Sequence, residues 1–119
     1  MADDLQKLAA AAARNAHAPY SHFQVGAAIR TTDGRVFSGC NVENAAYPEG
    51  WCAETTAIGH MVMDGGGRIA EVAVLSLQAD MCTPCGGCRQ RLAEFGSPGT
   101  LVHLCNASGC VETVTLGEL

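Results

Sequence analysis

The most constraining feature of the sequence is a βαβ pattern in its second half. Residues 69–77 (IAEVAVLSL) form a strongly apolar run that is typical of a buried strand, and residues 101–106 (LVHLCN) form another. Between them, the segment CGGCRQRLAEFG follows Pro84 and reaches Gly96, which are common signals for the start and end of a helix. A strand, a helix and a strand in this order predict a mixed sheet that is covered by helices.

The remaining segments complete an element order of α-β-β-α-β-α-β-β. An alanine-rich N-terminal helix is expected to place Leu5, Leu8 and Ala12 on one face. The sequence TTDG at residues 31–34 predicts a hairpin turn. The other expected elements are strands at residues 23–30, 35–42 and 111–116 and a helix that opens at residue 52 and stops at the glycines 65–67. The length predicts a single domain, residues 1–119, that buries roughly two thirds of its unfolded surface.

Charge and composition exclude several classes of protein. The net charge of −5 argues against a nucleic-acid-binding protein, because such a protein presents a basic face. No apolar run approaches the roughly 18 residues of a membrane span, so no membrane partner is expected. The apolar part of the N-terminus is alanine and makes a poor signal peptide. Seven cysteines without such a signal indicate a reducing, cytoplasmic location, where clustered cysteines act as ligands or nucleophiles.

Three evenly spaced cysteines, Cys82, Cys85 and Cys88, indicate a metal or redox site. Cys85 and Cys88 fall in the first turn of the expected helix, where unpaired N–H groups and the helix dipole stabilise thiolates. Cys82 precedes the proline and does not share that helix face. An iron–sulfur cluster is disfavoured, because Leu92 stands where the ferredoxin pattern requires a fourth cysteine. A thioredoxin-like redox pair remains open.

Cys52 and Glu54, at the start of the preceding expected helix, supply the third ligand and the carboxylate that a catalytic zinc site needs in addition to Cys85 and Cys88. Cys-Ala-Glu followed by Pro-Cys-x-x-Cys is the zinc-deaminase signature, with cysteine replacing histidine as the first ligand. Three protein ligands leave one zinc position open for water, and the Glu54 carboxylate can accept and pass on a proton. A structural zinc needs a fourth ligand; Cys82 is the candidate, and we predict that it does not bind. Each residue considered alone also has a structural explanation. Glu54 suits a favourable contact with the helix dipole, and Cys52 suits the role of a small buried side chain.

Three blocks of sequence carry a resemblance to a known family. PYSHFQVGAAI, GCNVENAAYPEGWCAETTAI and TPCGGCRQRL occur in this order between residues 19 and 92. With these blocks the sequence resembles the free-nucleoside cytidine deaminases of the small, homotetrameric class. The resemblance implies a three-layer α/β/α fold around a five-stranded mixed sheet. It also implies zinc-dependent hydrolysis of cytidine and deoxycytidine to uridine and deoxyuridine, with release of ammonia.

The resemblance also assigns roles to single residues. The matching positions are Cys52, Cys85 and Cys88 for the ligands of one zinc ion per chain and Glu54 for the proton shuttle. The matching substrate-binding positions are Asn41 and Glu43 for the ribose, Phe23 for the pyrimidine pocket, Ala53 for a backbone contact to the base and Tyr47 for the site of a neighbouring subunit. A homotetramer with shared active sites is therefore implied. From the residues alone, Phe23 would also suit a core position and Asn41 a turn.

Position 55 departs from the family pattern. Thr55 stands where the family commonly has an arginine that offsets thiolate charge. Three thiolates and Zn²⁺ sum to a net charge of −1, which weakens the metal as a Lewis acid. We expect the two helix N-termini to offset this charge, with Arg89 or Arg91 as further candidates.

Three other functions fit part of the sequence. A nucleic-acid deaminase would share the zinc site, but the acidic charge argues against it, as does the short link at Ser108-Gly109, which suits a hairpin between the last two strands. Deamination of a nucleoside analogue or antibiotic could use the same scaffold, although the Asn-Val-Glu block favours an ordinary ribose. A non-enzymatic zinc or redox module is the third alternative.

Overall fold

The computed structural model describes residues 2–119 and has the expected order of elements. Its helices are α1 (Ala2–Ala13), α2 (Ala53–Met63) and α3 (Gly86–Phe95), and its strands are β1 (Val25–Thr31), β2 (Val36–Cys40), β3 (Ile69–Ser76), β4 (Leu101–Asn106) and β5 (Gly109–Thr115). Two short 3-10 helices, η1 (Tyr47–Glu49) and η2 (Leu116–Glu118), precede α2 and follow β5. The predicted order of helices and strands is confirmed. Within the described residues, no helix is long and apolar enough to cross a membrane.

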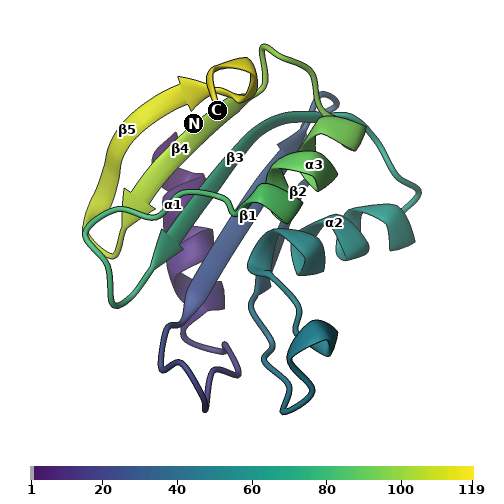
Figure 1. The fold of residues 1–119 in the computed structure, drawn as a ribbon. Helices are drawn as coiled ribbons and strands as arrows, with labels where there is room; N and C mark the ends of the chain where they lie inside the picture. Colours follow the sequence, from purple (N-terminus) through teal and green to yellow (C-terminus); the bar gives the residue numbers. More distant parts are fainter. Residues whose placement is uncertain (1) are drawn as a thin grey trace.

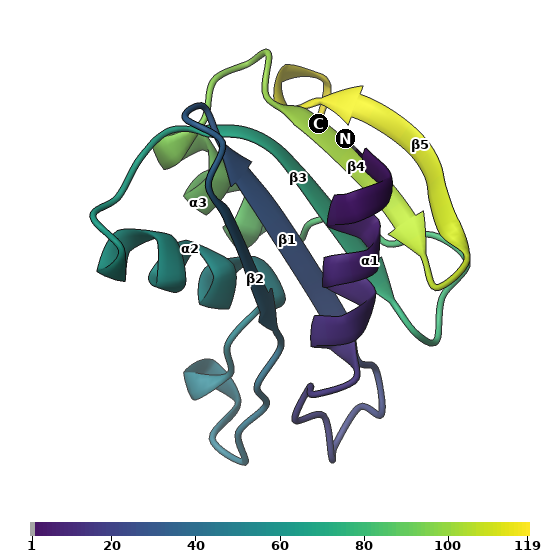
Figure 2. The ribbon, with the colours of Figure 1, turned by 180° about the vertical axis from the view of Figure 1, so that it is seen from behind.

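The five strands form one mixed sheet in the order β2-β1-β3-β4-β5. Strands β3 and β4 are parallel, with Val72 opposite Val102, and the other neighbouring pairs are antiparallel. Helix α1 covers one face of the sheet, whereas α2 and α3 cover the other (Figure 1 and Figure 2). This arrangement confirms the three-layer α/β/α fold, the mixed sheet and the final β4–β5 hairpin.

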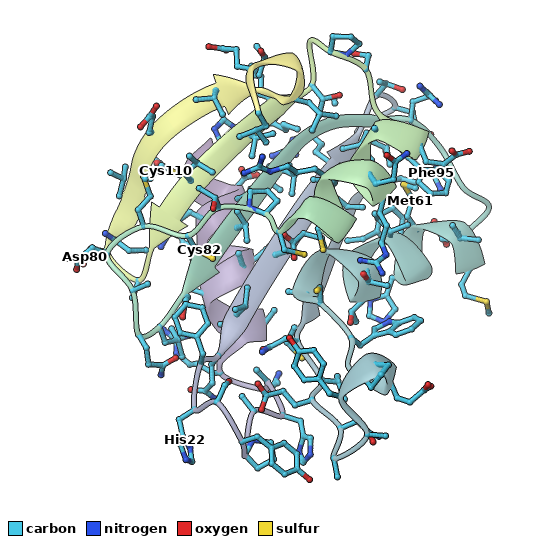
Figure 3. All side chains as sticks on the ribbon, in the orientation of Figure 1. His22, Met61, Asp80, Cys82, Phe95 and Cys110 are labelled. Atoms are coloured by element: carbon cyan, nitrogen blue, oxygen red, sulfur yellow. The ribbon has the colours of Figure 1, made fainter. Side chains whose placement is uncertain are left out.

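Alternating side chains of β3 contribute to both halves of the core. Val72 and Val74 pack with Met61 of α2 and with α3 on one face. Ala73 and Leu75 pack against α1 on the other face. Figure 3 shows side chains on both sides of the sheet, with Met61 on α2. Since both faces are covered, β3 is apolar along most of its length, as its sequence indicated.

The buried face of α1 differs from the predicted one. The prediction that Leu5, Leu8 and Ala12 share the buried face is wrong, because Leu8 is 41% exposed. Leu5 and Ala9 are fully buried instead. A Cβ atom on Gly26 of β1 would lie only 1.9 Å from the carbonyl oxygen of Ala9. This close approach of helix and strand leaves space for alanine but not for leucine, so Leu8 faces away from the sheet.

Most strand ends differ from the predicted ones by one or two residues, with β2 ending at Cys40 and not at residue 42, and the starts of two strands show the reason. Strand β1 begins at Val25 and not at Phe23, because the Phe23 N–H donates to the Ser21 hydroxyl at 3.0 Å and joins the preceding loop. Strand β5 begins at Gly109, two residues before the predicted start, because the hairpin turn holds only two residues. The first difference matters for the site, since it releases the Phe23 side chain from the sheet.

Two loops meet at one end of the sheet, below β1 and β2 in Figure 1. They consist of residues 14–24 and 41–52. The His17 N–H donates to the Asn41 carbonyl at 3.1 Å, and the His17 carbonyl accepts from the Glu43 N–H at 2.7 Å. These bonds hold the loops side by side, so residues far apart in the sequence line the same end of the molecule.

Candidate metal centre and substrate cavity

The N-termini of α2 and α3 bring three cysteine thiols together. Cys52 is the N-cap of α2, Cys85 is the N-cap of α3, and Cys88 lies in the first turn of α3. Their sulfur atoms all lie within 4.8 Å of one another, and we call them the thiol triad. The Cys88 N–H, one of the groups that a helix start leaves unpaired, donates to the Cys85 sulfur at 3.4 Å. The dipoles of both helices favour negative charge on the triad.

The donor set and the spacing of the triad fit zinc. Tetrahedral zinc binds cysteine sulfur at about 2.3 Å, which separates neighbouring sulfurs by roughly 3.8 Å. The Cys52 and Cys85 sulfurs are 3.7 Å apart. Within residues 2–119, no other group of three possible ligands comes together, and Cys82 lies outside the triad. Three protein ligands match a catalytic zinc site, because a closed structural site uses four.

Hydrogen bonds within the triad favour a thiolate. The pKa of Cys52 lies well below its usual range, mainly because the Cys88 thiol donates a hydrogen bond to it, and burial only partly opposes this effect. The same hydrogen bond, together with burial, raises the pKa of Cys88. One sulfur is therefore ready to bind a cation, and the remaining protons leave as the metal binds.

A guanidinium group lies beside the triad. Arg91 Nη1 donates to the Cys88 sulfur at 3.7 Å. Arg89, the other candidate from the sequence, donates instead to the Pro84 carbonyl at 3.2 Å. Thr55 cannot supply a positive charge, and its buried hydroxyl has no hydrogen-bond partner among the described residues. Of the two arginines considered, the structure therefore brings Arg91 to the thiols.

Glu54 lies in the first turn of α2 and is only 3% exposed. Burial, together with the negative charge of Cys52, raises its pKa to about 6. Its carboxyl group is not among the clustered metal-ligand candidates, in agreement with a position near the metal but not on it. A carboxyl group that titrates near neutral pH can both accept and release a proton, which suits general acid–base chemistry.

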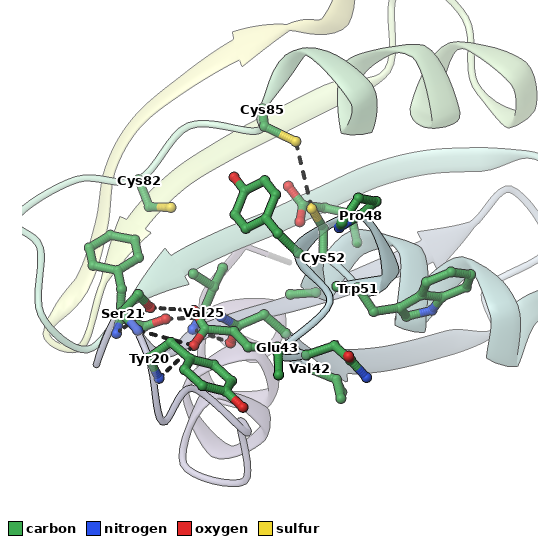
Figure 4. Close-up of a pocket in the computed structure, with 18 of the residues that line it drawn as sticks. Tyr20, Ser21, Val25, Val42, Glu43, Pro48, Trp51, Cys52, Cys82 and Cys85 are labelled. Carbon is green, nitrogen blue, oxygen red and sulfur yellow. Dashed lines mark hydrogen bonds between the residues drawn. The ribbon is translucent and has the colours of Figure 1, made fainter.

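A cavity of about 870 Å³ opens in front of the triad, between the two loops and the starts of α2 and α3 (Figure 4). This volume lies within the range of roughly 300–1,000 Å³ that is usual for ligand pockets. The lining residues include Cys52, Cys85, Glu54 and all five residues predicted to bind substrate: Phe23, Asn41, Glu43, Tyr47 and Ala53. Cys88 does not line the cavity. The fold thus gathers the predicted site residues around one space.

The Glu43 carboxylate is held by the loop that precedes β1. Its Oε1 atom accepts from the N–H groups of Tyr20 and Ser21, each at 3.1 Å, and its Oε2 atom accepts from the Ser21 hydroxyl. These bonds, with those from Ser21 contributing most, lower the pKa of Glu43. Figure 4 shows this network at the mouth of the cavity. Glu43 is therefore an ionised acceptor in a fixed position.

The Asn41 side chain connects the cavity wall to β1. Its Oδ1 atom accepts from the Val25 N–H at 2.9 Å, and its Nδ2 atom donates to the Phe23 carbonyl at 2.9 Å. An amide side chain has two donor hydrogens and two acceptor lone pairs. Asn41 therefore keeps one donor and one acceptor for a ligand.

Sequence reasoning did not assign eleven of the lining residues to the site, among them Tyr20, Ser21, Trp51 and Cys82. Tyr20 and Trp51 are exposed aromatic residues in loops, which is a signal for binding that could have found them. Burial, together with the nearby charges of Glu54 and Cys85, raises the pKa of Cys82 to about 11. The Cys82 sulfur lies outside the thiol triad, which favours the prediction that it does not bind zinc.

Comparisons with known proteins agree with this geometry. Residues 2–104 match the family described as the cytidine and deoxycytidylate deaminase zinc-binding region. The cytidine deaminase of Sporosarcina psychrophila is 41% identical over 119 residues, which cover 98% of this chain and 88% of that protein.

Two solved structures are also similar along nearly the whole chain. The cytidine deaminase of Burkholderia pseudomallei is 44% identical with a TM-score of 0.89, and the match covers 97% of this chain and 92% of that one. The cytidine deaminase of Mycobacterium tuberculosis is 39% identical with a TM-score of 0.87, and the match covers 97% and 89%. Sequence and fold thus point to the same group of proteins.

Proposed function

The chain belongs to the cytidine and deoxycytidylate deaminase family, and from that premise we propose that it converts cytidine and deoxycytidine to uridine and deoxyuridine by zinc-dependent hydrolysis, with release of ammonia. The observation that carries this proposal is the meeting of the thiol triad and the Glu54 carboxyl group beside one cavity. A three-cysteine zinc site with a nearby carboxyl group that is not a ligand is the arrangement that hydrolytic deamination requires.

The reaction needs one group that first accepts and then donates protons. When bound by the triad, zinc supplies a Lewis acid that lowers the pKa of a water molecule toward 7. Glu54 would accept a proton from the attacking water as the water oxygen forms a bond to C4 of the pyrimidine. Glu54 then gives the proton to N3, which receives the electron pair of the former C4–N3 double bond.

The second half of the reaction releases ammonia. Glu54 takes the remaining hydroxyl proton and transfers it to the amino group on C4. The C4–N bond then breaks, ammonia leaves, and a carbonyl group forms at C4. The pKa of about 6 suits both roles of Glu54, because the carboxyl group gains and loses protons readily near neutral pH.

The ribose is bound by groups that the loops already hold in place. Ser21 and Tyr20 occupy part of the acceptor capacity of Glu43, and Oε2 keeps a lone pair for a ribose hydroxyl. Asn41 contributes its remaining donor and acceptor to the same sugar edge. Since these groups are fixed before binding, a sugar that lacks the hydroxyl groups shared by cytidine and deoxycytidine is rejected.

The base lies between Phe23 and the start of α2. Phe23 lines the cavity and offers an apolar ring to the face of the pyrimidine. The N–H group of Ala53, the first residue of α2, has no partner within the helix and can donate to the base. These contacts support the base as the group that reaches Glu54.

We assign the active form to a homotetramer with shared sites. Tyr47 is 91% exposed in the single chain although it lines the cavity, and the neighbouring Trp51 and Val42 are also exposed. Large apolar side chains around a cavity mouth are typical of surfaces that another protein covers. A second copy that packs against η1 would close the cavity and exclude bulk water.

The loss of ultraviolet absorbance on mixing with cytidine tests the proposed activity. The zinc-loaded protein should consume cytidine and deoxycytidine, and a chelator should abolish turnover until zinc is returned. A protein that binds one zinc per chain but leaves both nucleosides unchanged would contradict the proposal. Such a protein would instead be tested on base-modified cytidines.

A further inference from the structure

Two further thiols lie on the β4–β5 hairpin, on strands that contribute no residue to the thiol triad. The strand register places Cys105 directly opposite Cys110, and their sulfur atoms are 2.8 Å apart. Cys105 is fully buried beneath α1, whereas Cys110 is half-buried on the edge strand β5 (Figure 3). The proposed function uses neither thiol.

The hairpin geometry suits a covalent bond between these sulfurs. A disulfide has an S–S distance of about 2.05 Å and Cβ atoms roughly 3.5–4.5 Å apart. Directly opposed residues of antiparallel strands have Cβ atoms about 4.5–5.5 Å apart, so only a small closing movement is needed. The register shifts between Leu104 and Cys105, and such a bulge gives the strands local freedom to make this movement.

The sheet separates this pair from the thiol triad. Cys105 and Cys110 pack with the core cluster beneath α1, which includes Leu5 and Ala9. The triad lies at the starts of α2 and α3, which cover the opposite face (Figure 1 and Figure 2). Oxidation of one group therefore does not require any change in the other.

We propose that Cys105 and Cys110 are a redox modification site, at which a low-molecular-weight disulfide converts the two thiols to a reversible cross-strand disulfide. Cys110 reacts first, because it is more accessible than Cys105, whose pKa is raised by burial. Its thiolate attacks the small disulfide and releases one small thiol. The Cys105 sulfur then attacks Cys110 and releases the second. The cysteine pair loses two electrons and two protons, and the small disulfide gains them.

The new bond links the edge of the sheet to its interior. Strand β5 lies at the edge of the sheet beside β4, and it leads into the C-terminal η2 helix. Next to the thiol pair, the Gln6 side chain of α1 donates to the Asn106 carbonyl at 2.8 Å. A disulfide at Cys105 would therefore hold the hairpin at the point where α1 is attached, so that the edge strand resists fraying.

Zinc-loaded protein treated with oxidised glutathione tests this proposal. We expect peptide mapping after alkylation to find Cys105 and Cys110 protected in one intramolecular disulfide, with one zinc per chain retained. The melting temperature should rise by about 5 °C and should return to its original value after reduction. Cys110→Ser should abolish both the disulfide and the rise in melting temperature, whereas the control Cys40→Ser should show both.

Three outcomes would overturn the proposal. In the first, both hairpin thiols still react with the alkylating agent after treatment. In the second, glutathione remains attached to Cys110 and Cys105 does not displace it. In the third, oxidation of the hairpin pair releases zinc, which would show that the two groups of thiols are not separate.

Discussion

At the residue scale, burial gives Glu54 its chemical properties. An exposed glutamate would be fully ionised at pH 7 and a poor proton donor, but burial raises the pKa of Glu54 to about 6. The start of α2 also places it two residues from Cys52 of the thiol triad. One local sequence feature therefore positions both a thiol of the triad and a carboxyl group that titrates near neutral pH.

Replacing Glu54 with glutamine should separate proton transfer from metal binding. Glu54→Gln keeps the shape of the side chain but cannot accept a proton. We expect turnover to fall by about 10⁴-fold, while zinc content and cytidine binding stay close to those of the unmodified protein. Steady-state kinetics and metal analysis measure these quantities. Near-normal turnover would exclude Glu54 as the proton shuttle. Loss of zinc would instead show that Glu54 binds the metal or supports its site.

Arg91 should strengthen zinc binding through its charge. Three thiolates leave a zinc site with a net charge of −1, and the Arg91 contact with Cys88 offsets it. We expect Arg91→Gln to weaken zinc binding by roughly 10–100-fold, as loss of a group that contacts a metal ligand commonly does. Arg91→Lys, which keeps the charge, should recover part of the affinity.

The control for this prediction is Arg89→Gln on the same helix, because Arg89 contacts a backbone carbonyl and not a sulfur. Competition with a chromogenic chelator measures zinc affinity in all three variants. Equal affinities in Arg91→Gln and Arg89→Gln would mean that the guanidinium near Cys88 has no effect on the metal.

At the scale of elements, the position of α1 depends on the absence of a side chain at Gly26. A Cβ atom there would lie 1.9 Å from the Ala9 carbonyl oxygen and 2.8 Å from the Ala13 nitrogen. We expect Gly26→Ala to push α1 away from β1 and to lower the free energy of unfolding by about 3 kcal/mol. Chemical denaturation measures the change.

Gly59 provides the matched control, because it lies on the exposed side of α2, where an added Cβ atom would have no neighbour within 4 Å. Gly59→Ala should stabilise the protein by about 0.5–1 kcal/mol, since alanine favours a helix. If Gly26→Ala is as stable as Gly59→Ala, the helix and strand are not in close contact.

A polar network ties α1 to the same face of the sheet and should make stability depend on pH. Arg30 bridges Asp4 of α1 and Glu71 of β3, and Glu71 also bonds to His103 at 2.8 Å. Burial alone would raise the pKa of Glu71, but its bonds to His103 and Arg30 outweigh burial and lower it. Glu71 therefore adds stability above its unfolded pKa of about 4.5, and this stability is lost as the pH falls through the lower folded value.

Glu71→Gln should remove this contribution. We expect zinc-free Glu71→Gln to melt below the zinc-free unmodified protein at pH 7, and the difference should narrow below pH of about 4. Thermal melts at a series of pH values measure the difference. A gap that stays constant down to acidic pH would mean that the charge of Glu71 does not contribute.

At the scale of the whole molecule, the cavity is open where Tyr47 and Trp51 are exposed. Light scattering should give a mass four times the chain mass of 12.3 kDa. Tyr47→Ala should reduce turnover at unchanged zinc content, because the residue would act in a site shared between copies. A fully active monomer would contradict the shared site.

The sequence by itself determined the order of elements and pointed to the three cysteines that form the thiol triad. These features depend on local signals. Pro84 and Gly96 mark a helix, apolar runs mark strands, and Cys52 and Cys85 stand at helix starts, where a short motif is sufficient to recognise them. The face of the N-terminal helix was predicted incorrectly, because the periodicity allows either Leu8 or Ala9 to face the sheet.

Only the tertiary structure decided the contacts between segments that are distant in the sequence. Packing against Gly26 selected Ala9 over Leu8, and the path of α3 brought Arg91, not Arg89, to the thiols. The hairpin register likewise placed Cys105 against Cys110. These outcomes depend on differences of an ångström or two in packing and register. A linear pattern of residue types carries no information about such distances, because they arise only when all layers of the fold are assembled.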